Sequence, residues 1–416
     1  MNKRRNTIRM RQHGVAMIVA LVLLVAATLT ALFTNRNLVF GVKSQANQIK
    51  SIMAQEAAMG GLEASLAVLA KKTNREKLLI GSPSDPVTDP WYDGTLYGFF
   101  LDTSNTPNGL VDEVRLAATT DGTMPTAPVG VNISSFQARF KRLSTPSTIT
   151  DPNRAILINV LGCADGQAPG AAACTSRALA TQSVVFKPSM VSAPSAALTA
   201  KGNVSFSGNV TITNTEAATN GTTVHAGGTY TSDGSADLVT VPGTPPEASV
   251  AKEDSTLSNL TGDRFFQGFF GESKDSVKAE AVQIDCNGPC PSAIDSVDGQ
   301  GKVIWVNTTS GAQINSNVTI GTASEPVILI VDGPLQINGN VVIYGVVYCS
   351  AFTWNNSGGG TSQIIGAAIA EGNFQATGTP NPTYDSNVLN NVKRNLGSYV
   401  RIPGGWKDWC NDCDFH

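Results

Sequence analysis

The chain has 416 residues, of which 15% are charged, and its formal net charge is −3, so the composition indicates no nucleic-acid partner. Hydrophobic residues make up 41% of the sequence, which is enough for real cores, and the length is too great for one small domain. Its 40 glycines and many short β-branched runs favour a β-rich architecture over a helical bundle.

The first strong feature is an uncharged stretch from Val15 to Phe33, VAMIVALVLLVAATLTALF. At about 1.5 Å per helical residue, it just spans a hydrocarbon core of about 30 Å. The basic leader at residues 1–14 predicts a cytoplasmic N-terminus, with the rest of the chain outside. Three interpretations compete at this point: a secretory signal peptide, a plain signal anchor, and a prepilin signal that is cut before the apolar stretch.

The helical pattern continues beyond the membrane-length stretch. Apolar residues recur at spacings of three and four and no proline intervenes, which predicts one helix over residues 15–72 with possible bends at Gly41 and Gly60–Gly61. The residues of this apolar stripe are Leu38, Val42, Ile49, Ile52, Met59, Leu62, Leu66 and Leu69. This continuation, together with Gly14 at the junction of leader and apolar stretch, favours the prepilin interpretation.

The segment RQHGVAMIVALVLLVAATLTAL, followed by AQEAAMGGLEASLAVL, resembles the N-terminal region of PilX-type pilus assembly proteins, which are minor pilins of type IV pili. The resemblance covers roughly residues 9–70. It implies that a prepilin peptidase cuts after Gly14 and that Val15 becomes a new N-terminus, which is usually methylated.

The chain departs from the major pilins at one position. They carry Glu at the fifth mature residue, where this chain has Val19. Because an unpaired carboxylate in apolar surroundings is costly, that Glu is thought to pair with a neighbouring subunit's terminal amine. We therefore hypothesise a low-copy subunit at or near the pilus tip, where no amine needs neutralising.

Residues 73–190 are expected to form an α+β pilin head, with the long helix packed on an antiparallel sheet. The stretch 75–125 is rich in turn residues and predicts loops. Strands are expected at 131–143, 154–164 and 176–188. The first and third alternate polar and apolar residues, as half-buried antiparallel strands do, whereas the second is more uniformly apolar.

The loop DTSNTPNGLVDE, Asp102 to Glu113, resembles a degenerate calcium loop. Pro107 stands where an EF-type loop requires Gly, so turn chemistry favours a solvated loop over a calcium site. If calcium binds, the expected ligands are Asp102, Asn108, Asp112 and Glu113. No other cofactor is expected.

Residues 191–416 predict a β-rich module, in which three kinds of short strand recur in order. Gly321, Gly345 and Gly366 close the third strand at spacings of 24 and 21 residues, which favours a parallel β-solenoid over a β-sandwich. Residues from about 214 to 300 are expected to be an insertion. The segment SNVLNNVKRNL predicts a short helix, and the aromatic C-terminal tail is expected to cap the open end of the solenoid.

Six of the seven cysteines form three close pairs along the chain, Cys163–Cys174, Cys286–Cys290 and Cys410–Cys413. Disulfides are favoured because the chain is expected to be exported, whereas zinc bound by CNGPC and CNDC remains the alternative. Cys349 lies in an apolar run and is expected to be a small buried hydrophobe.

Few residues of the predicted solenoid suit catalysis. Carboxylates do not cluster, since Asp332 and Glu371 stand 39 residues apart, and no Ser-His-Asp order is evident around His13, His225 or His416. Trp305, Phe352 and Trp354 could mark an exposed binding face, but aromatics of a solenoid are more often core. The chain is therefore not expected to be an enzyme.

The favoured function is that of a minor pilin in type IV pilus assembly or at the tip, whose β-rich module serves adhesion or partner binding. Expected partners are other minor pilins, the prepilin peptidase, the inner-membrane assembly platform and a tip adhesin. The chain is expected in the inner membrane of a Gram-negative-type bacterium, with its head in the periplasm, and then on the pilus. The alternatives are a membrane-anchored solenoid scaffold and a carbohydrate-active enzyme.

Overall fold

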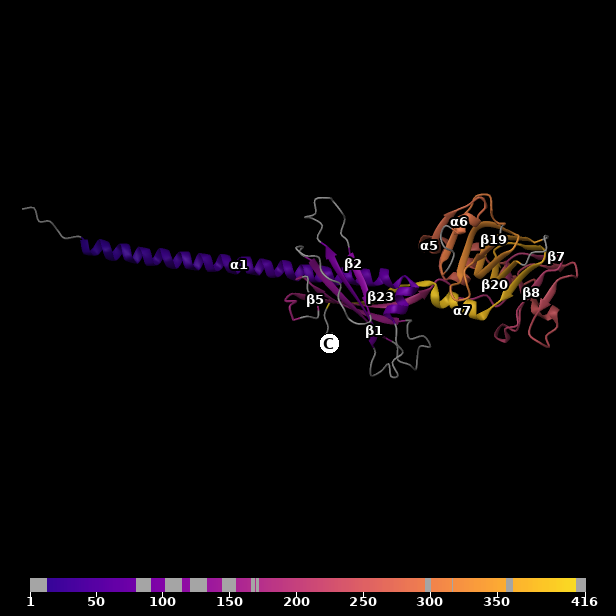
Figure 1. The fold of residues 1–416 in the computed structure, drawn as a ribbon, viewed down its shortest axis with the longest axis horizontal. Helices are drawn as coiled ribbons and strands as arrows, with labels where there is room; N and C mark the ends of the chain where they lie inside the picture. Colours follow the sequence, from indigo (N-terminus) through magenta and orange to yellow (C-terminus); the bar gives the residue numbers. More distant parts are fainter. Residues whose placement is uncertain are drawn as a thin grey trace, which may run out of the picture. The chain divides into compact units, whose positions relative to one another are not determined.

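The computed structural model describes residues 13–79, 91–101, 114–119, 133–143, 155–165, 169, 172–295, 301–315, 317–356 and 362–408. The chain divides into two compact units (Figure 1). One comprises residues 1–68, 73–184 and 401–416, and the other comprises residues 69–72 and 185–400.

The N-terminal helix α1 (His13–Leu69) confirms the predicted continuous helix, and a short helix α2 (Lys72–Leu78) follows it. The buried stripe of α1 begins only at Ala54 and continues through Ala58, Leu62 and Leu69. The first half of the predicted stripe is therefore not covered by the head, because Leu38, Val42, Ile49 and Ile52 are 56–63% exposed.

The first unit contains a sheet in the order β2-β1-β3-β4-β5-β23, and its recorded pairings β1–β2, β1–β3 and β3–β4 are antiparallel. The predicted strands at 131–143, 154–164 and 176–188 are confirmed as β3 (Ile133–Arg142), β4 (Ala155–Cys163) and β5 (Arg177–Pro188).

Two strands of this sheet lie in the region expected to be loops, β1 (Trp91–Leu101) and β2 (Val114–Thr119). The expectation of loops over 75–125 was wrong for these residues. The sequence of β1, WYDGTLYGFFL, is rich in aromatic strand formers, but the turn-rich segments on both sides conceal them.

The helix packs closely on the sheet because a glycine of the helix leaves room for large side chains of the strands. Phe136 of β3 and Val160 of β4 are fully buried, and a Cβ on Gly61 of α1 would lie within 2.8 Å of their side chains. This packing of α1 on an antiparallel sheet is the predicted α+β arrangement of the first unit.

The second unit is a curled parallel sheet of 17 strands among the described residues. In chain order its strands are β6 (Leu198–Ala200), β7 (Val204–Ser207), β8 (Thr211–Thr213), β9 (Val224–Ala226), β10 (Tyr230–Ser232), β11 (Asp237–Val239), β12 (Val250–Ala251), β13 (Val282–Asp285), β14 (Gly288–Pro289), β15 (Val303–Asn307), β16 (Ala312–Ile314), β17 (Val318–Ile320), β18 (Val327–Asn338), β19 (Val341–Asn356), β20 (Ser362–Ala370), β21 (Phe374–Gly378) and β22 (Pro380–Tyr384). Each strand pairs in parallel with strands of the neighbouring turns, which confirms the predicted solenoid.

Glycine at the predicted corner is required by close backbone contact. Gly345 lies opposite Gly366 in the register of β19 and β20, with φ of +134° and +136°. A Cβ on Gly366 would overlap the carbonyl oxygen of Gly345. The corner therefore excludes other residues for both steric and conformational reasons.

The turns of the solenoid do not stack in chain order. The last turn, β20–β22, pairs with the first, β6–β8, through registers such as Ala368 with Leu198 and Phe374 with Val204. The chain thus enters in the middle of the stack and winds toward one end at β12. It then crosses to the opposite end at β13 and winds back.

The expected insertion at 214–300 was largely wrong. These residues hold solenoid strands: β9–β11 pair with β6–β8, and β12 pairs with β9. β13 and β14 likewise pair with β15 and β16. The crossing between β12 and β13 is helical, with α3 (Ser255–Ser258), α4 (Gly262–Phe270) and α5 (Lys274–Glu280), and α6 (Pro291–Asp295) follows β14. Strands of two to four residues between long turns give little periodicity, which is why this part of the pattern was missed.

Helices cover one outer face of the solenoid and leave a second core beneath them. This second core includes Phe265 and Phe266 of α4 and Leu389 of α7 (Ser386–Asn395), which pack on Tyr348 and Trp305. Trp305 is one of the three aromatics considered for an exposed binding face. The interior core holds the other two, Phe352 and Trp354, each at most 1% exposed. All three aromatics are therefore core residues.

The described part of the C-terminal segment, residues 397–408, does not cap the solenoid. After α7, which confirms the predicted short helix, β23 (Gly397–Lys407) lies beside β5 in the sheet of the first unit. Thr181 Oγ1 donates a hydrogen bond of 3.3 Å to the carbonyl of Lys407. The expected cap was wrong because the segment completes a sheet edge.

Candidate functional site

The exposed surface of α1 is the most unusual feature of the first unit. Met17, Leu23, Leu32 and Phe33 are 63–74% exposed, and the helix is long and apolar enough to cross a membrane, by length and composition. Past this stretch, further exposed apolar side chains occur among polar ones as far as Ile52. A surface of this size in water would be costly, so it requires a lipid or protein environment.

The position that distinguishes the chain from major pilins lies within this exposed surface. Val19 is 51% exposed on α1. Gly14 and Val15, the predicted processing site, lie in the first turn of the same helix. Cleavage between them stays a prediction.

Just before α1 becomes buried, a polar contact joins the helix to the chain that follows β4. Lys50 Nζ lies 2.7 Å from Asp165 Oδ1, while the backbone NH and hydroxyl of Thr175 donate to Oδ2 at 2.8 and 2.7 Å. The Lys50 bond, followed by that of the Thr175 hydroxyl, lowers the pKa of Asp165 well below its ordinary value. This contact orients the exposed half of α1 relative to the sheet.

Asp165 also lies beside a pair of sulfur atoms. Potential ligand atoms of Cys163, Asp165 and Cys174 lie within 4.8 Å of one another, as in a metal site. Both sulfurs, however, belong to the disulfide Cys163–Cys174, so neither offers a thiolate to a metal. The arrangement fastens the turn between β4 and β5.

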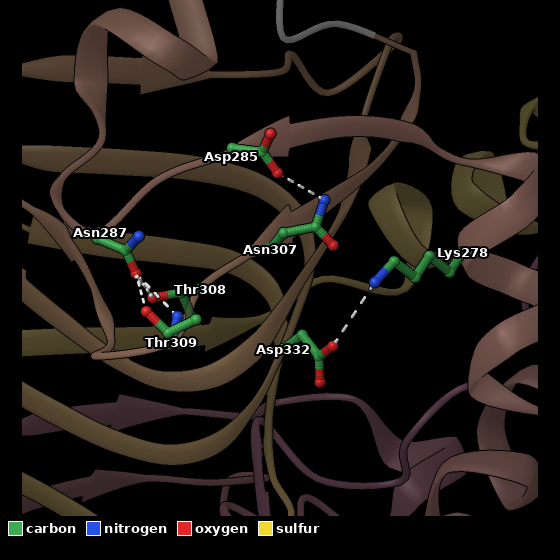
Figure 2. A pocket seen from close by; sticks show the side chains of 7 residues that line it. All are labelled: Lys278, Asp285, Asn287, Asn307, Thr308, Thr309 and Asp332. Carbon is green, nitrogen blue, oxygen red and sulfur yellow. Dashed lines mark hydrogen bonds and ion pairs between the residues drawn. The ribbon is translucent and has the colours of Figure 1, made fainter.

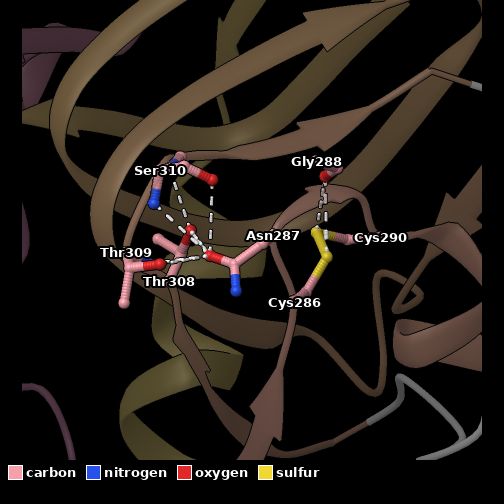
Figure 3. The surroundings of a disulfide bond; sticks show 8 residues. Cys286, Asn287, Gly288, Cys290, Thr308, Thr309 and Ser310 are labelled. Carbon is pink, nitrogen blue, oxygen red and sulfur yellow. Dashed lines mark hydrogen bonds between the residues drawn. A yellow bond between two sulfur atoms is a disulfide. The ribbon is translucent and has the colours of Figure 1, made fainter.

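The second disulfide, Cys286–Cys290, encloses a tight loop at the end of the solenoid (Figure 3). Asn287 Oδ1, within this loop, accepts hydrogen bonds from the backbone NH of Thr309 at 2.8 Å and from the Thr308 hydroxyl at 3.1 Å. The disulfide and the amide together order the outermost turn. Cys410–Cys413 and the calcium candidates Asp102, Asn108, Asp112 and Glu113 lie outside the described residues.

An open cavity of about 370 Å³ lies on the surface beside this loop (Figure 2). Asp285, Asn307 and Asp332 occupy the same position in three successive turns, so that their side chains form a column. Asn307 Nδ2 donates to Asp285 Oδ1 at 2.9 Å, and Asn307 Oδ1 is buried without a partner in the described part of the chain. The lining residues are Lys278, Asp285, Asn287, Asn307, Thr308, Thr309 and Asp332.

Two carboxylates that are distant in sequence both meet helix α5. Lys274 Nζ lies 2.6 Å from Glu371 Oε2, and Lys278 Nζ lies 4.0 Å from Asp332 Oδ2. In the sequence, Asp332 and Glu371 argue against a catalytic cluster because of their separation, and the two lysines that face them were not predicted. Their spacing of four residues, which places them on one helix face, was the available signal.

The Glu371 contact reaches into the covered core. Tyr348 Oη donates to Glu371 Oε2 at 2.8 Å. Burial, and then the charge of Glu371, raises the pKa of Tyr348 far above its ordinary value, so the hydroxyl stays protonated. A carboxylate held by both a lysine and a tyrosine fastens the helix to the sheet, which is a structural role.

His225 is the one histidine whose side-chain surroundings are described, and it pairs with Asp254. His225 Nε2 lies 2.8 Å from Asp254 Oδ2, and the other oxygen of Asp254 accepts from the NH and hydroxyl of Thr256. The Thr256 hydroxyl first, and then His225, lower the pKa of Asp254 to about 2. The described residues around this pair offer no serine nucleophile in hydrogen-bond contact with the imidazole.

Comparison with known proteins yields little. No protein-family model matches the chain, and no curated protein matches it. Among solved structures, the competence-associated pilin ComZ from Thermus thermophilus is similar over 86% of this chain and 97% of its own, with 12% identity and a TM-score of 0.19. A likeness of this size supports no argument, so the function rests on the features of the chain.

Proposed function

We propose that the protein is a minor pilin of a type IV pilus, anchored in the inner membrane before assembly. One observation carries the proposal: a single helix exposes apolar side chains from Met17 to Ile52, in an uncharged stretch to Phe33 and among polar residues beyond it, and then packs on an antiparallel sheet from Ala54. A membrane anchor alone would explain the stretch to Phe33. It would not explain the exposed apolar residues that follow.

Those following residues, Leu38, Val39, Phe40, Val42, Ile49 and Ile52, extend beyond a membrane span when the apolar stretch lies in the bilayer. In a filament, the corresponding helices of neighbouring subunits would cover them. Partners of this kind are other pilins, and assembly would require the inner-membrane platform. The solenoid would then be available for adhesion or for binding a tip adhesin.

Mass spectrometry of the mature N-terminus tests the proposal, after expression of the chain with a prepilin peptidase. A protein that starts at Val15, with a methylated amine, is the expected result. An intact Met1 would support a stationary membrane scaffold instead. A start beyond Phe33 would remove the anchor and overturn the pilin proposal.

The residue at position 19 makes a second test possible. Since Val19 offers no carboxylate to a neighbouring amine, we expect few copies of the wild-type chain per pilus, located near the tip. Val19→Glu should raise incorporation along the shaft, counted by immunogold labelling. Val19→Leu is the matched control, and abundant wild-type protein along the shaft would contradict a tip location.

We further propose that the protein is not an enzyme. The support is that two carboxylates of the solenoid, Asp332 and Glu371, each face a lysine of α5. Turnover of a polysaccharide that is abolished by Glu371→Gln or Asp332→Asn would overturn this proposal in favour of a carbohydrate-active enzyme.

A further inference from the structure

One outer face of the solenoid is a parallel sheet formed by β16, the second halves of β18 and β19, β21, β7 and β10. Side chains that point outward at the same position of successive strands form columns along it. The first column consists of Gln313, Gln336, Thr353, Gln375, Ser205 and Thr231. The second consists of Asn338, Asn355, Thr377 and Ser207.

These ten residues, which we call the polar face, share two properties. Every side chain is an amide or a hydroxyl, and none carries a charge. Thr353, Asn355, Gln375, Thr377, Ser207 and Thr231 are exposed, and the other four are partly exposed. The residues between them, such as Trp354 and Phe374, point inward and are fully buried.

The face covered by helices provides a comparison within the same molecule. Its outward column includes Trp305, Ile330, Tyr348 and Ile369, which are apolar or aromatic because α4 and α7 pack on them. The polar face presents no such aromatic or aliphatic anchor. Protein–protein interfaces depend on buried anchors of that kind, so a protein partner fits this surface poorly.

We propose that the polar face binds a neutral β-1,4-linked glycan that lies across the strands. Deepening the proposed function, this inference assigns a ligand class to the module that the pilin would expose. Adjacent strands are about 4.8 Å apart, so the columns repeat hydrogen-bonding groups at short, regular intervals. A flat glycan ribbon presents hydroxyl groups at similarly regular intervals along its edges.

Hydrogen-bonding chemistry agrees with that ligand. Amides and hydroxyls both donate and accept, as sugar hydroxyls do, so either orientation of a hydroxyl finds a partner. Because the polar face has no charge, an anionic or cationic polymer would lose water without gaining an ion pair. The expected ligand is therefore uncharged, and its binding should not depend on salt.

The test uses the full chain in detergent and measures its binding to microcrystalline cellulose and to chitin. Carboxymethyl cellulose on beads is the matched polymer, with the same backbone and added charge. We expect binding to at least one neutral polymer, unchanged from low to high salt, and weaker binding to carboxymethyl cellulose. Absence of binding to both neutral polymers would overturn the inference, as would stronger binding to the charged one.

Variants locate the site. Thr353→Lys and Gln375→Lys place a charge in the centre of the polar face and should each weaken binding about tenfold, since the charge would be desolvated without a partner. Thr319→Lys, on exposed strand β17 outside the polar face, should leave binding unchanged. Thermal unfolding checks that the lysine variants fold. If they do not, Ser207→Ala is the milder substitution, and it should weaken glycan binding to a smaller extent. Equal binding by Thr353→Lys, Gln375→Lys and wild type would overturn the assignment.

The result can be separated from that of the pilin proposal. Binding to cellulose or chitin without a Val15 start or pilus incorporation would retain the inference and refute the function. Incorporation into pili without glycan binding would do the reverse. Capture of a pilus protein through the polar face, lost in Thr353→Lys, would replace the glycan with a protein partner and so contradict the inference.

Discussion

Gly162 of β4 lies directly against Ala54 of α1, so closely that a Cβ on Gly162 would overlap the Ala54 carbonyl oxygen. The contact is where α1 changes from an exposed helix to one that is buried against the sheet. Any side chain at this position would push the helix away from the strands. The docking of α1, and thus the direction of its exposed half, depends on this glycine.

We therefore expect Gly162→Ala to destabilise the first unit by about 1–3 kcal/mol, as overpacked cores do. Hydrogen exchange of the amides of β3 and β4 measures the effect. Gly41→Ala is the matched control, because a Cβ on Gly41 meets nothing within 4 Å. It should stabilise the helix by about 1 kcal/mol, since Ala has the higher helix propensity. Unchanged protection in Gly162→Ala would show that α1 does not dock as described.

Removal of either disulfide should destabilise the fold according to the length of chain that it closes. The bonds Cys163–Cys174 and Cys286–Cys290 join residues 11 and 4 positions apart. By loop-closure entropy, paired Cys→Ser changes should cost about 3 and about 2 kcal/mol, respectively. Chemical denaturation measures both costs, and peptide mapping without reductant checks the pairing. Free thiols or retained zinc at these four positions would contradict it.

The three residues of the Tyr348–Glu371–Lys274 contact should contribute unequally to the stability of the second unit. Tyr348→Phe removes one hydrogen bond but keeps the packed ring, and should cost about 1 kcal/mol. Glu371→Ala leaves both the buried hydroxyl and Lys274 without their acceptor, and should cost about 1–3 kcal/mol. Hydrogen exchange of α4 and α5 measures the loosening. Arg394→Ala, at an exposed position of α7's last turn, is the control.

Acid should weaken the contact between Asp254 and His225. The folded pKa of Asp254 is lowered to about 2, from about 3.9 in an unfolded chain. A lowered pKa stabilises the fold at pH values above the unfolded pKa, and this stability disappears as the pH falls from about 4 through 2. Asp254→Asn should therefore melt below wild type at neutral pH, but together with it near pH 2. A constant difference across that range would contradict this assignment.

The solenoid shows how far the sequence could be interpreted. The regular turns around Gly345 and Gly366 were recognised, because strands there are long and the glycine corner repeats. The turns at β9–β12 were predicted to be an insertion, because their strands have only two or three residues. Each of these turns also takes 26 residues, as from Val224 to Val250. Local patterns of that length cannot be told from loops.

The two candidate surfaces, the exposed part of α1 and the polar face, also differ in how far the sequence predicted them. The exposed helix was predicted nearly to its ends, since a membrane-length apolar stretch and a spacing of three and four are properties of consecutive residues. The polar face was not recognised. Its neighbours Gln375 and Ser205 are 170 positions apart in the chain, and only the pairing of β21 with β7 brings them together.

By itself, the sequence determined the long helix, the antiparallel strands at 133–188 and the parallel solenoid, because each is encoded by a short repeating pattern. Tertiary structure alone decided that the last turn of the solenoid stacks on the first and that β23 lies beside β5 at the edge of the antiparallel sheet. The reason is physical. Backbone pairing between strands satisfies the same hydrogen bonds whichever turn is adjacent, so the choice of neighbour depends on how the whole chain buries its edges and apolar faces.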